Sequence, residues 1–191
     1  HTDFANGDSC LVTILASQVT DQDGTPNNMD QDYSWAFEVT NGCFVGSTTP
    51  IHDIQGSGLV SPIVGQSVIA EALVVADYQS VYSIRGFFIE EPDGEQDANP
   101  ATSEGVFIYD NNFGVEVAVG DYVRVAGTVG EYQEQTQLTT ITAVTLCEND
   151  PVDATPVTVT LPFSVTTFPE RFEGMSVTLP QTMTVSENYN L

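Results

Sequence analysis

Apolar and polar residues alternate over short stretches of this chain, a pattern typical of half-buried β-strands rather than of amphipathic helices. Val68, Ala70, Ala72 and Val74 occupy every second position of one such stretch. Runs rich in Val, Ile, Thr, Phe and Tyr are separated by clusters of Asn, Asp, Gly, Pro, Ser and Thr. No stretch sustains a 3.6-residue period with helix caps. The sequence therefore predicts an all-β protein.

The clearest block of strand signals covers residues 63–148. A long first strand opens the block, and Gly127 interrupts the fourth strand as a candidate β-bulge or sharp coil. Five strands in this arrangement predict a small Greek-key barrel of the OB type. The predicted strands are Ser67–Tyr78, Ile84–Glu91, Gly105–Tyr109, Tyr122–Glu131 and Gln137–Cys147.

A separate β segment of unknown type is predicted for residues 1–50, before the barrel. It contains two strand candidates, Cys10–Leu15 and Trp35–Thr40, which are joined by a polar loop. Residues 51–62 contain two glycines and a proline, and this composition predicts a linker into the barrel.

The C-terminal segment, residues 149–191, begins with a linker rich in Asp and Pro. Its predicted strands are Val157–Leu161, Met175–Leu179 and Met183–Ser186. These are too few to close an independent barrel. We therefore expect this segment to pack on the barrel, to exchange a strand with another chain, or to begin a further domain.

The charge balance excludes several kinds of partner. The chain of 191 residues has 27 Asp and Glu against three basic residues, Arg85, Arg124 and Arg171, for a net charge of −24. Three arginines cannot form a basic groove, which disfavours nucleic acid and excludes polybasic binding to anionic lipid. No apolar run approaches the roughly 20 residues of a membrane helix, so no membrane insertion is expected. The acidity instead offers many oxygen ligands to hard cations.

Several short motifs occur in a fixed order between Ile51 and Leu191. They are IHDIQGSG from Ile51, GFFIEE from Gly86, DANPATSEG from Asp97, VGDYVRVAGTV from Val119, QTQL from Gln135, ERFEGM from Glu170 and TVSENYNL from Thr184. Together they resemble the OB-fold, YhcR-like accessory region of secreted bacterial extracellular nucleases of the ExeM/NucH type. Residues 1–50 lie outside the resemblance.

The resemblance implies a noncatalytic, secreted, extracellular module that positions a downstream catalytic domain and binds nucleic acid with calcium. In that family a metal-dependent nuclease domain follows this region and needs a constellation of His, Asp, Asn and Glu. The chain has only His1 and His52 and no His-Asp pairing motif. No catalysis is therefore expected from these residues.

The chain contains three cysteines, Cys10, Cys43 and Cys147. There is no CxxC motif or His/Cys cluster, which argues against a zinc site. The resemblance implies a Cys43–Cys147 disulfide between the two ends of the barrel, with Cys10 free or paired between chains. A Cys10–Cys43 bridge across a two-stranded unit is the rival pairing.

An acidic loop after the second barrel strand carries oxygen ligands at regular spacing. The spacing reproduces positions 1, 3, 5, 7 and 12 of an EF-hand loop, but Ala98 stands where glycine is needed and no helices flank the loop. A true EF-hand is therefore not expected. A Ca²⁺ site built from several of these oxygens is one interpretation, and a solvated acidic loop is the other. The candidate ligands are Asp93, Glu95, Asp97, Asn99 and Glu104.

A second candidate calcium loop lies within residues 1–50. Asp21, Asp23 and Asn27 supply alternating oxygens, and Gly24 permits a tight turn. The alternative is an ordinary turn rich in Asp, Asn and Gly.

Candidate nucleic-acid contacts lie on the barrel. OB folds bind single strands by stacking bases on aromatic residues beside a basic groove. Phe87 and Phe88 are adjacent on one predicted strand, so at most one of them faces outward. Arg85 and Arg124 are the nearby cations. Core packing is the default role of each ring.

The alternative function is a self-assembling extracellular structural protein, such as a filament or matrix subunit. It would reuse the OB fold and exchange strands between identical subunits. Residues 1–50, the odd Cys10 and the incomplete C-terminal segment favour this alternative.

Overall fold

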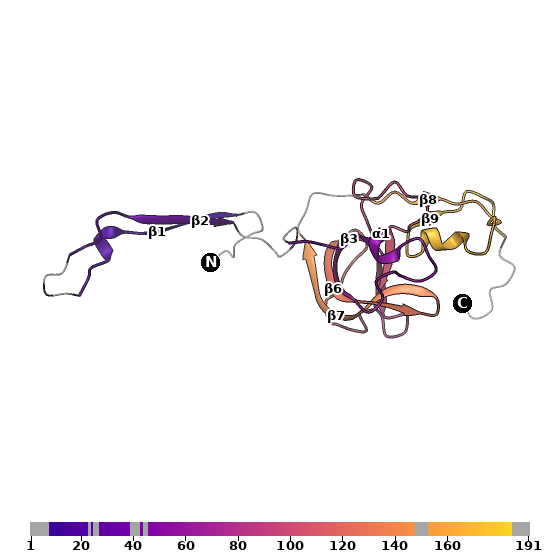
Figure 1. The fold of residues 1–191 in the computed structure, drawn as a ribbon, viewed down its shortest axis with the longest axis horizontal. Coiled ribbons are helices and arrows are strands. Elements are labelled where there is room, and N and C mark those ends of the chain that lie inside the picture. Colours follow the sequence, from indigo (N-terminus) through magenta and orange to yellow (C-terminus); the bar gives the residue numbers. More distant parts are fainter. Residues whose placement is uncertain are drawn as a thin grey trace. The chain divides into compact units, whose positions relative to one another are not determined.

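The computed structural model describes residues 8–22, 24, 27–38, 43, 46–147 and 153–184. The chain forms two units, His1–Gly42 and Cys43–Leu191 (Figure 1). The boundary lies before Cys43 rather than near residue 50. The Cys43–Cys147 disulfide and a bond from the Thr49 amide to the Ile69 carbonyl tie this stretch to the barrel.

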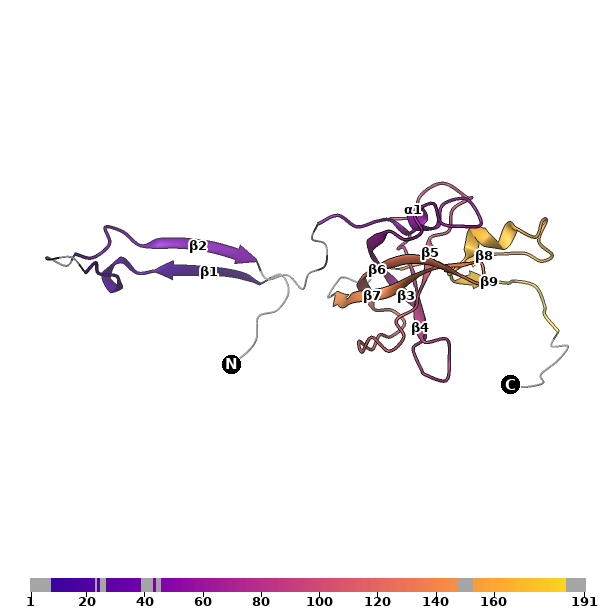
Figure 2. The same cartoon turned by 60° about the horizontal axis from the view of Figure 1, so that its bottom comes forward.

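The N-terminal unit is a two-stranded antiparallel hairpin. Strand β1 (Ser9–Ile14) pairs with β2 (Tyr33–Glu38), and a short 3-10 helix, η1 (Ala16–Gln18), follows β1. Figure 2 shows the two strands as opposed arrows. Both predicted strands are therefore present, with β2 beginning two residues earlier than expected; Val39 and Thr40 lie outside the described residues.

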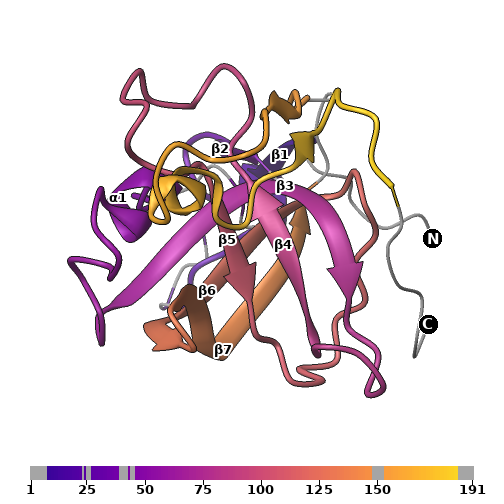
Figure 3. The ribbon, with the colours of Figure 1, turned by 90° about the vertical axis from the view of Figure 1, so that its right-hand side faces the viewer.

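The second unit contains the closed five-stranded barrel. Its strands run in the order β3-β4-β5-β7-β6, and β3 pairs with β6 to close it. Only the β5–β7 pairing is parallel, and the other four pairings are antiparallel. Figure 3 labels the strands of the barrel, β3 to β7. The predicted all-β, OB-type barrel is confirmed. Its strands are β3 (Ser67–Tyr78), β4 (Gly86–Glu90), β5 (Gly105–Ile108), β6 (Tyr122–Tyr132) and β7 (Gln135–Cys147).

Every second side chain along the barrel strands points inward, and these side chains form the core. Val68, Ala70, Ala72 and Val74 are at most 7% exposed, as their period of two predicts. The register between β6 and β7 shifts between Ala126 and Thr128, where Gly127 faces residues 140–142 of β7. The irregularity lies at the predicted place, but its extra residues belong to β7 and not to the strand that contains Gly127. A Cβ at this glycine would lie 2.8 Å from Ile141 Cδ1.

Residues 51–62, predicted as a linker, begin instead with a short helix, α1 (Ile51–Gln55). Ile51 and Ile54 are fully buried among the barrel residues, and the Ser61 hydroxyl donates to the Ile54 carbonyl. A five-residue helix is too short to show a 3.6-residue repeat, which is why the pattern missed it. The described helices have at most five residues, and none is long and apolar enough to cross a membrane.

The C-terminal segment packs on the barrel, one of the three arrangements expected for it. The parallel strands β8 (Val157–Thr158) and β9 (Val177–Thr178) flank a 3-10 helix, η2 (Phe168–Phe172). Both strands are shorter than predicted. Met183 and Thr184 are not in a strand, and residues 185–186 lie outside the described range.

A disulfide joins the first residue of the barrel unit to the last residue of β7. Cys43 and Cys147 have their Cα atoms 5.8 Å apart, and Cys10 is a free thiol. The pairing implied by the resemblance is therefore present, and the rival Cys10–Cys43 pairing is not.

Candidate functional site

Three titratable side chains from distant parts of the sequence meet beside the barrel. His52 lies on α1, Glu91 directly follows β4, and Glu104 directly precedes β5. Since β4 and β5 are antiparallel neighbours, the end of one adjoins the start of the other. The Glu91 amide accordingly donates to the Glu104 carbonyl at 2.9 Å. We call His52, Glu91 and Glu104 the His-Glu-Glu cluster.

The donor atoms of the cluster face one another. His52 Nδ1 lies 2.9 Å from Glu91 Oε2 and 3.2 Å from Glu104 Oε2. The Ile51 amide donates to Glu91 Oε1 at 2.6 Å, and the Asp97 amide donates to Glu104 Oε1 at 3.2 Å. The His52 side chain is 18% exposed, and the two glutamate side chains are at most 7% exposed.

Burial and mutual repulsion shift the protonation of the cluster. Burial raises the pKa of Glu104 to about 8, and the neighbouring Glu91 carboxylate adds to the rise. Burial lowers the pKa of His52, but its hydrogen bonds and charge interactions with the two glutamates outweigh burial and leave that pKa raised. At neutral pH the cluster therefore holds protons that the same groups would lose in water.

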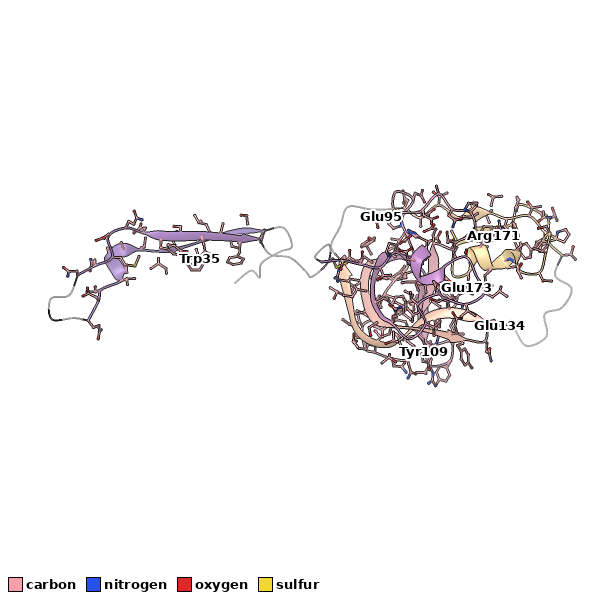
Figure 4. All side chains as sticks on the ribbon, viewed as in Figure 1. Trp35, Glu95, Tyr109, Glu134, Arg171 and Glu173 are labelled. Carbon is pink, nitrogen blue, oxygen red and sulfur yellow. A yellow bond between two sulfur atoms is a disulfide. The ribbon has the colours of Figure 1, made fainter. Side chains whose placement is uncertain are left out.

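Two further glutamates of this unit are also hard to ionise. Burial raises the pKa of Glu90 to about 7 and that of Glu173 to about 7. Glu173 Oε1 accepts hydrogen bonds from the Thr136 amide at 2.7 Å and from Gln55 Nε2 at 3.4 Å. Figure 4 labels Glu173 on the C-terminal segment.

Replacing Glu173 with Gln is expected to stabilise the protein at pH 8 and to change little at pH 5. With a folded pKa of about 7 against 4.5, folded Glu173 binds more protons than the unfolded chain, so stability falls as pH rises between these values. The carboxamide oxygen keeps both hydrogen bonds without the charge. Because the site is only partly buried, we expect a gain of about 1–2 kcal/mol at pH 8.

Urea unfolding at pH 5 and pH 8 measures this effect. Glu116→Gln, at an exposed position, is the control and should not change the pH dependence. An equal effect of Glu173→Gln at both pH values would contradict the assignment.

The structure does not bring the five predicted ligands of the acidic loop together. The Asp93 carboxylate accepts from the amide and hydroxyl of Thr155, at 2.7 and 2.6 Å. Asp97 Oδ1 accepts from the Asn99 amide, and Asn99 Oδ1 from the Ala101 amide. Glu95 (Figure 4) is an exposed residue outside the His-Glu-Glu cluster, and Glu104 belongs to that cluster. These side chains mostly satisfy amides of their own loop, which lacks an EF-hand's glycine and flanking helices.

The second calcium loop is described only in part. Asp21 Oδ1 accepts from the Asn27 amide at 2.9 Å, as in an ordinary turn. Asp23 lies outside the described residues. Calcium binding at this loop stays a prediction.

The predicted nucleic-acid residues do not form one surface. Phe87 is fully buried in the core and cannot stack on a base. Phe88 faces outward, as the alternation predicts, and packs against Tyr78 and Phe107.

The two arginines predicted to contact nucleic acid are engaged elsewhere. Arg124 forms an ion pair with Glu71, and the two side chains are at most 14% exposed. Arg85 is exposed and donates to Asn111 Oδ1 at 3.3 Å. The described residues therefore provide no basic groove.

The hairpin has one apolar face and one mixed face. Directly paired residues point to the same side of an antiparallel sheet, so the register places six apolar side chains together. Tyr33 is 60% exposed, Trp35 43% and Phe37 44%. The opposite face carries Ser9, Leu11, Thr13, Ser34 and Ala36. We define the apolar hairpin face as Cys10, Val12, Ile14, Tyr33, Trp35 and Phe37; Trp35 is labelled in Figure 4.

Sequence reasoning missed His52 and Glu91 as site residues. Both lie inside motifs that carry the family resemblance, IHDIQG and FFIEE, and this was the available signal. The alternation of Cys10, Val12 and Ile14 was likewise visible, but the facing register with β2 came only from the structure.

Comparison with known proteins leaves the function to be argued from these sites. No family model, no curated protein and no solved structure matches the chain.

Proposed function

We propose that this chain is a noncatalytic extracellular protein that self-associates through its apolar hairpin face and carries the OB barrel as a rigid body. The observation that supports this most is the exposure of the apolar hairpin face. A disulfide is typical of proteins that work outside the reducing cytosol, which supports the extracellular setting.

Among the described residues, the sheet of the hairpin consists of two strands. Isolated two-stranded hairpins are marginal in water, and three or more strands or a covering layer are needed for stability. Within the described residues, β1 and β2 pair only with each other, so each has a free edge. Its aromatic rings are 43–60% exposed, so burying them against another surface would stabilise the sheet.

A second copy of this hairpin fits the face best. None of the six face residues is charged, whereas the chain as a whole carries a net charge of −24. Two copies can therefore meet face to face without bringing carboxylates into contact there. A twofold arrangement apposes the same residues from each copy, as in isologous dimers.

The size of the face limits the strength of the contact. With three rings of ~150–250 Å² each about half exposed, the aromatic side chains of two apposed faces bury roughly 450–750 Å² in total. This is below the ~1,200–2,000 Å² of a standard stable interface. Pairing of the free strand edges must add to it, and this addition would extend a dimer into larger assemblies.

Replacing Trp35 and Phe37 with Thr is expected to weaken self-association strongly. Loss of two central aromatic anchors costs about 2–4 kcal/mol, so the dissociation constant should rise at least about thirtyfold. Light scattering of the full chain over a concentration series measures the mass. Association of the unmodified protein should strengthen with salt, because salt screens repulsion between highly negative copies.

The matched control is Leu11→Thr. Leu11 lies on the opposite face of the same hairpin and is 71% exposed. This variant should associate as the unmodified protein does. A monomeric mass of the unmodified protein at every concentration and salt, or an equal loss in Leu11→Thr, would overturn the proposal.

A second candidate function is that of an accessory region of a secreted nuclease-like protein. This reading rests on the motifs that resemble that family, which lie in the barrel unit alone; there Ile51 and Ile54 lie in the core, and Gly105 packs against Gly174. If the chain is such an accessory region, it should be a monomer that binds a single-stranded DNA oligonucleotide when Ca²⁺ is present. Fluorescence anisotropy tests it, with Phe88→Ala expected to weaken binding.

A further inference from the structure

The His-Glu-Glu cluster has the spacing of a metal site. Two ligands that each lie 2.0–2.2 Å from a tetrahedral ion are about 3.4 Å apart. The distances of 2.9 and 3.2 Å from His52 Nδ1 to the two Oε2 atoms are within a few tenths of an ångström of that value. The three donor atoms all lie within 4.8 Å of one another.

The surrounding backbone aims the two carboxylates inward. The outer oxygen of Glu91 is held by the Ile51 amide, and the outer oxygen of Glu104 by the Asp97 amide. Each glutamate therefore keeps one oxygen directed at His52 Nδ1. Such secondary hydrogen bonds, which orient the ligands, are typical of protein metal sites.

Charge also favours a cation here. Two glutamate side chains at most 7% exposed face one imidazole. A divalent ion would neutralise both carboxylates at once. Glu104 also lines a surface hollow of about 380 Å³ beside the C-terminal segment, and the His52 side chain is 18% exposed.

We propose that His52 Nδ1, Glu91 Oε2 and Glu104 Oε2 bind a first-row divalent metal ion, with Zn²⁺ the best match. One imidazole and two carboxylates with water as the fourth ligand suit Zn²⁺. Ca²⁺ takes 6–8 oxygen ligands, so a site with three protein donors and a nitrogen does not suit it. The sequence argued against zinc because it lacks cysteine clusters, whereas this site uses residues from three separate segments.

The test is calorimetric titration of the full chain with Zn²⁺ in millimolar Mg²⁺, which occupies weak carboxylate sites. We expect one ion per chain and a melting temperature several degrees higher, reversed by chelator. His52→Ala and Glu104→Gln should each weaken binding at least a hundredfold. Ca²⁺ at the same concentration should leave the melting temperature of the barrel unit unchanged.

Two controls separate this site from others. Asp53→Asn removes an exposed carboxylate from the same helix, and His1→Ala removes the other histidine of the chain. Both variants should bind Zn²⁺ as the unmodified protein does. Absence of binding, full binding by a folded His52→Ala variant, or loss of binding in His1→Ala would each overturn the proposal. Circular dichroism establishes that the variants fold.

Discussion

Removing the Cys43–Cys147 disulfide is expected to lower the free energy of unfolding of the barrel unit by about 4–5 kcal/mol. The two cysteines are 104 residues apart in sequence. In the chain-entropy model, releasing a loop of about 100 residues gives the unfolded state roughly 4.7 kcal/mol of additional freedom at 25 °C. Urea unfolding of the Cys43→Ser, Cys147→Ser double variant measures the loss.

Cys10→Ser is the matched control for this prediction. It removes the third cysteine without touching the disulfide, so the unfolding midpoint of the barrel should not change. If the double variant lies within about 1 kcal/mol of the unmodified protein, the disulfide does not carry the stability assigned to it. A net stability of about 5–15 kcal/mol is usual for a domain, so the expected loss is a large share.

Replacing Gly105 with Ala is expected to cost about 3 kcal/mol or more. A Cβ at Gly105 would lie 2.4 Å from the Gly174 carbonyl carbon and 2.5 Å from the Met175 nitrogen. Both are backbone atoms, so no side chain can rotate away. Overpacking usually costs about 1–3 kcal/mol, and more where the neighbour cannot yield. The loss is measured by urea unfolding.

Hydrogen exchange should locate the damage from Gly105→Ala. Protection should fall first along the C-terminal segment, at the Met175 amide, which donates to the Phe172 carbonyl. Gly94→Ala is the control, because a Cβ there has nothing within 4 Å. If Gly105→Ala lowers the free energy of unfolding no more than Gly94→Ala does, the backbone at Gly105 is not tightly packed against Gly174 and Met175.

The sequence predicted the barrel well because its strands alternate clearly. Ser67–Tyr78 matches β3 residue for residue, and the register shift between β6 and β7 lies beside Gly127, although its extra residues are on β7. Helix α1 was missed because its burial depends on contacts with distant strands. Ile51 and Ile54 look like any two apolar residues in a short polar stretch until the barrel is present.

The candidate site was also hard to predict from the sequence, because its contacts join distant residues. Regular spacing of acids around Glu104 predicted a metal ligand, but the partners of Glu104 are not its neighbours in the loop. His52 is 52 residues away from Glu104 and 39 away from Glu91. Spacing within a loop cannot report such contacts, because the strand pairing of β4 and β5 creates them.

The disulfide also determines how the protein responds to tension. A pull applied between the hairpin and the C-terminal segment enters the barrel unit at Cys43, and the covalent bond carries it directly to Cys147. The 104-residue stretch between the two cysteines then bears no load. Once the bond is reduced, the same pull could extend that stretch by roughly 350 Å. The redox state of the surroundings therefore determines whether the barrel can be extended by force.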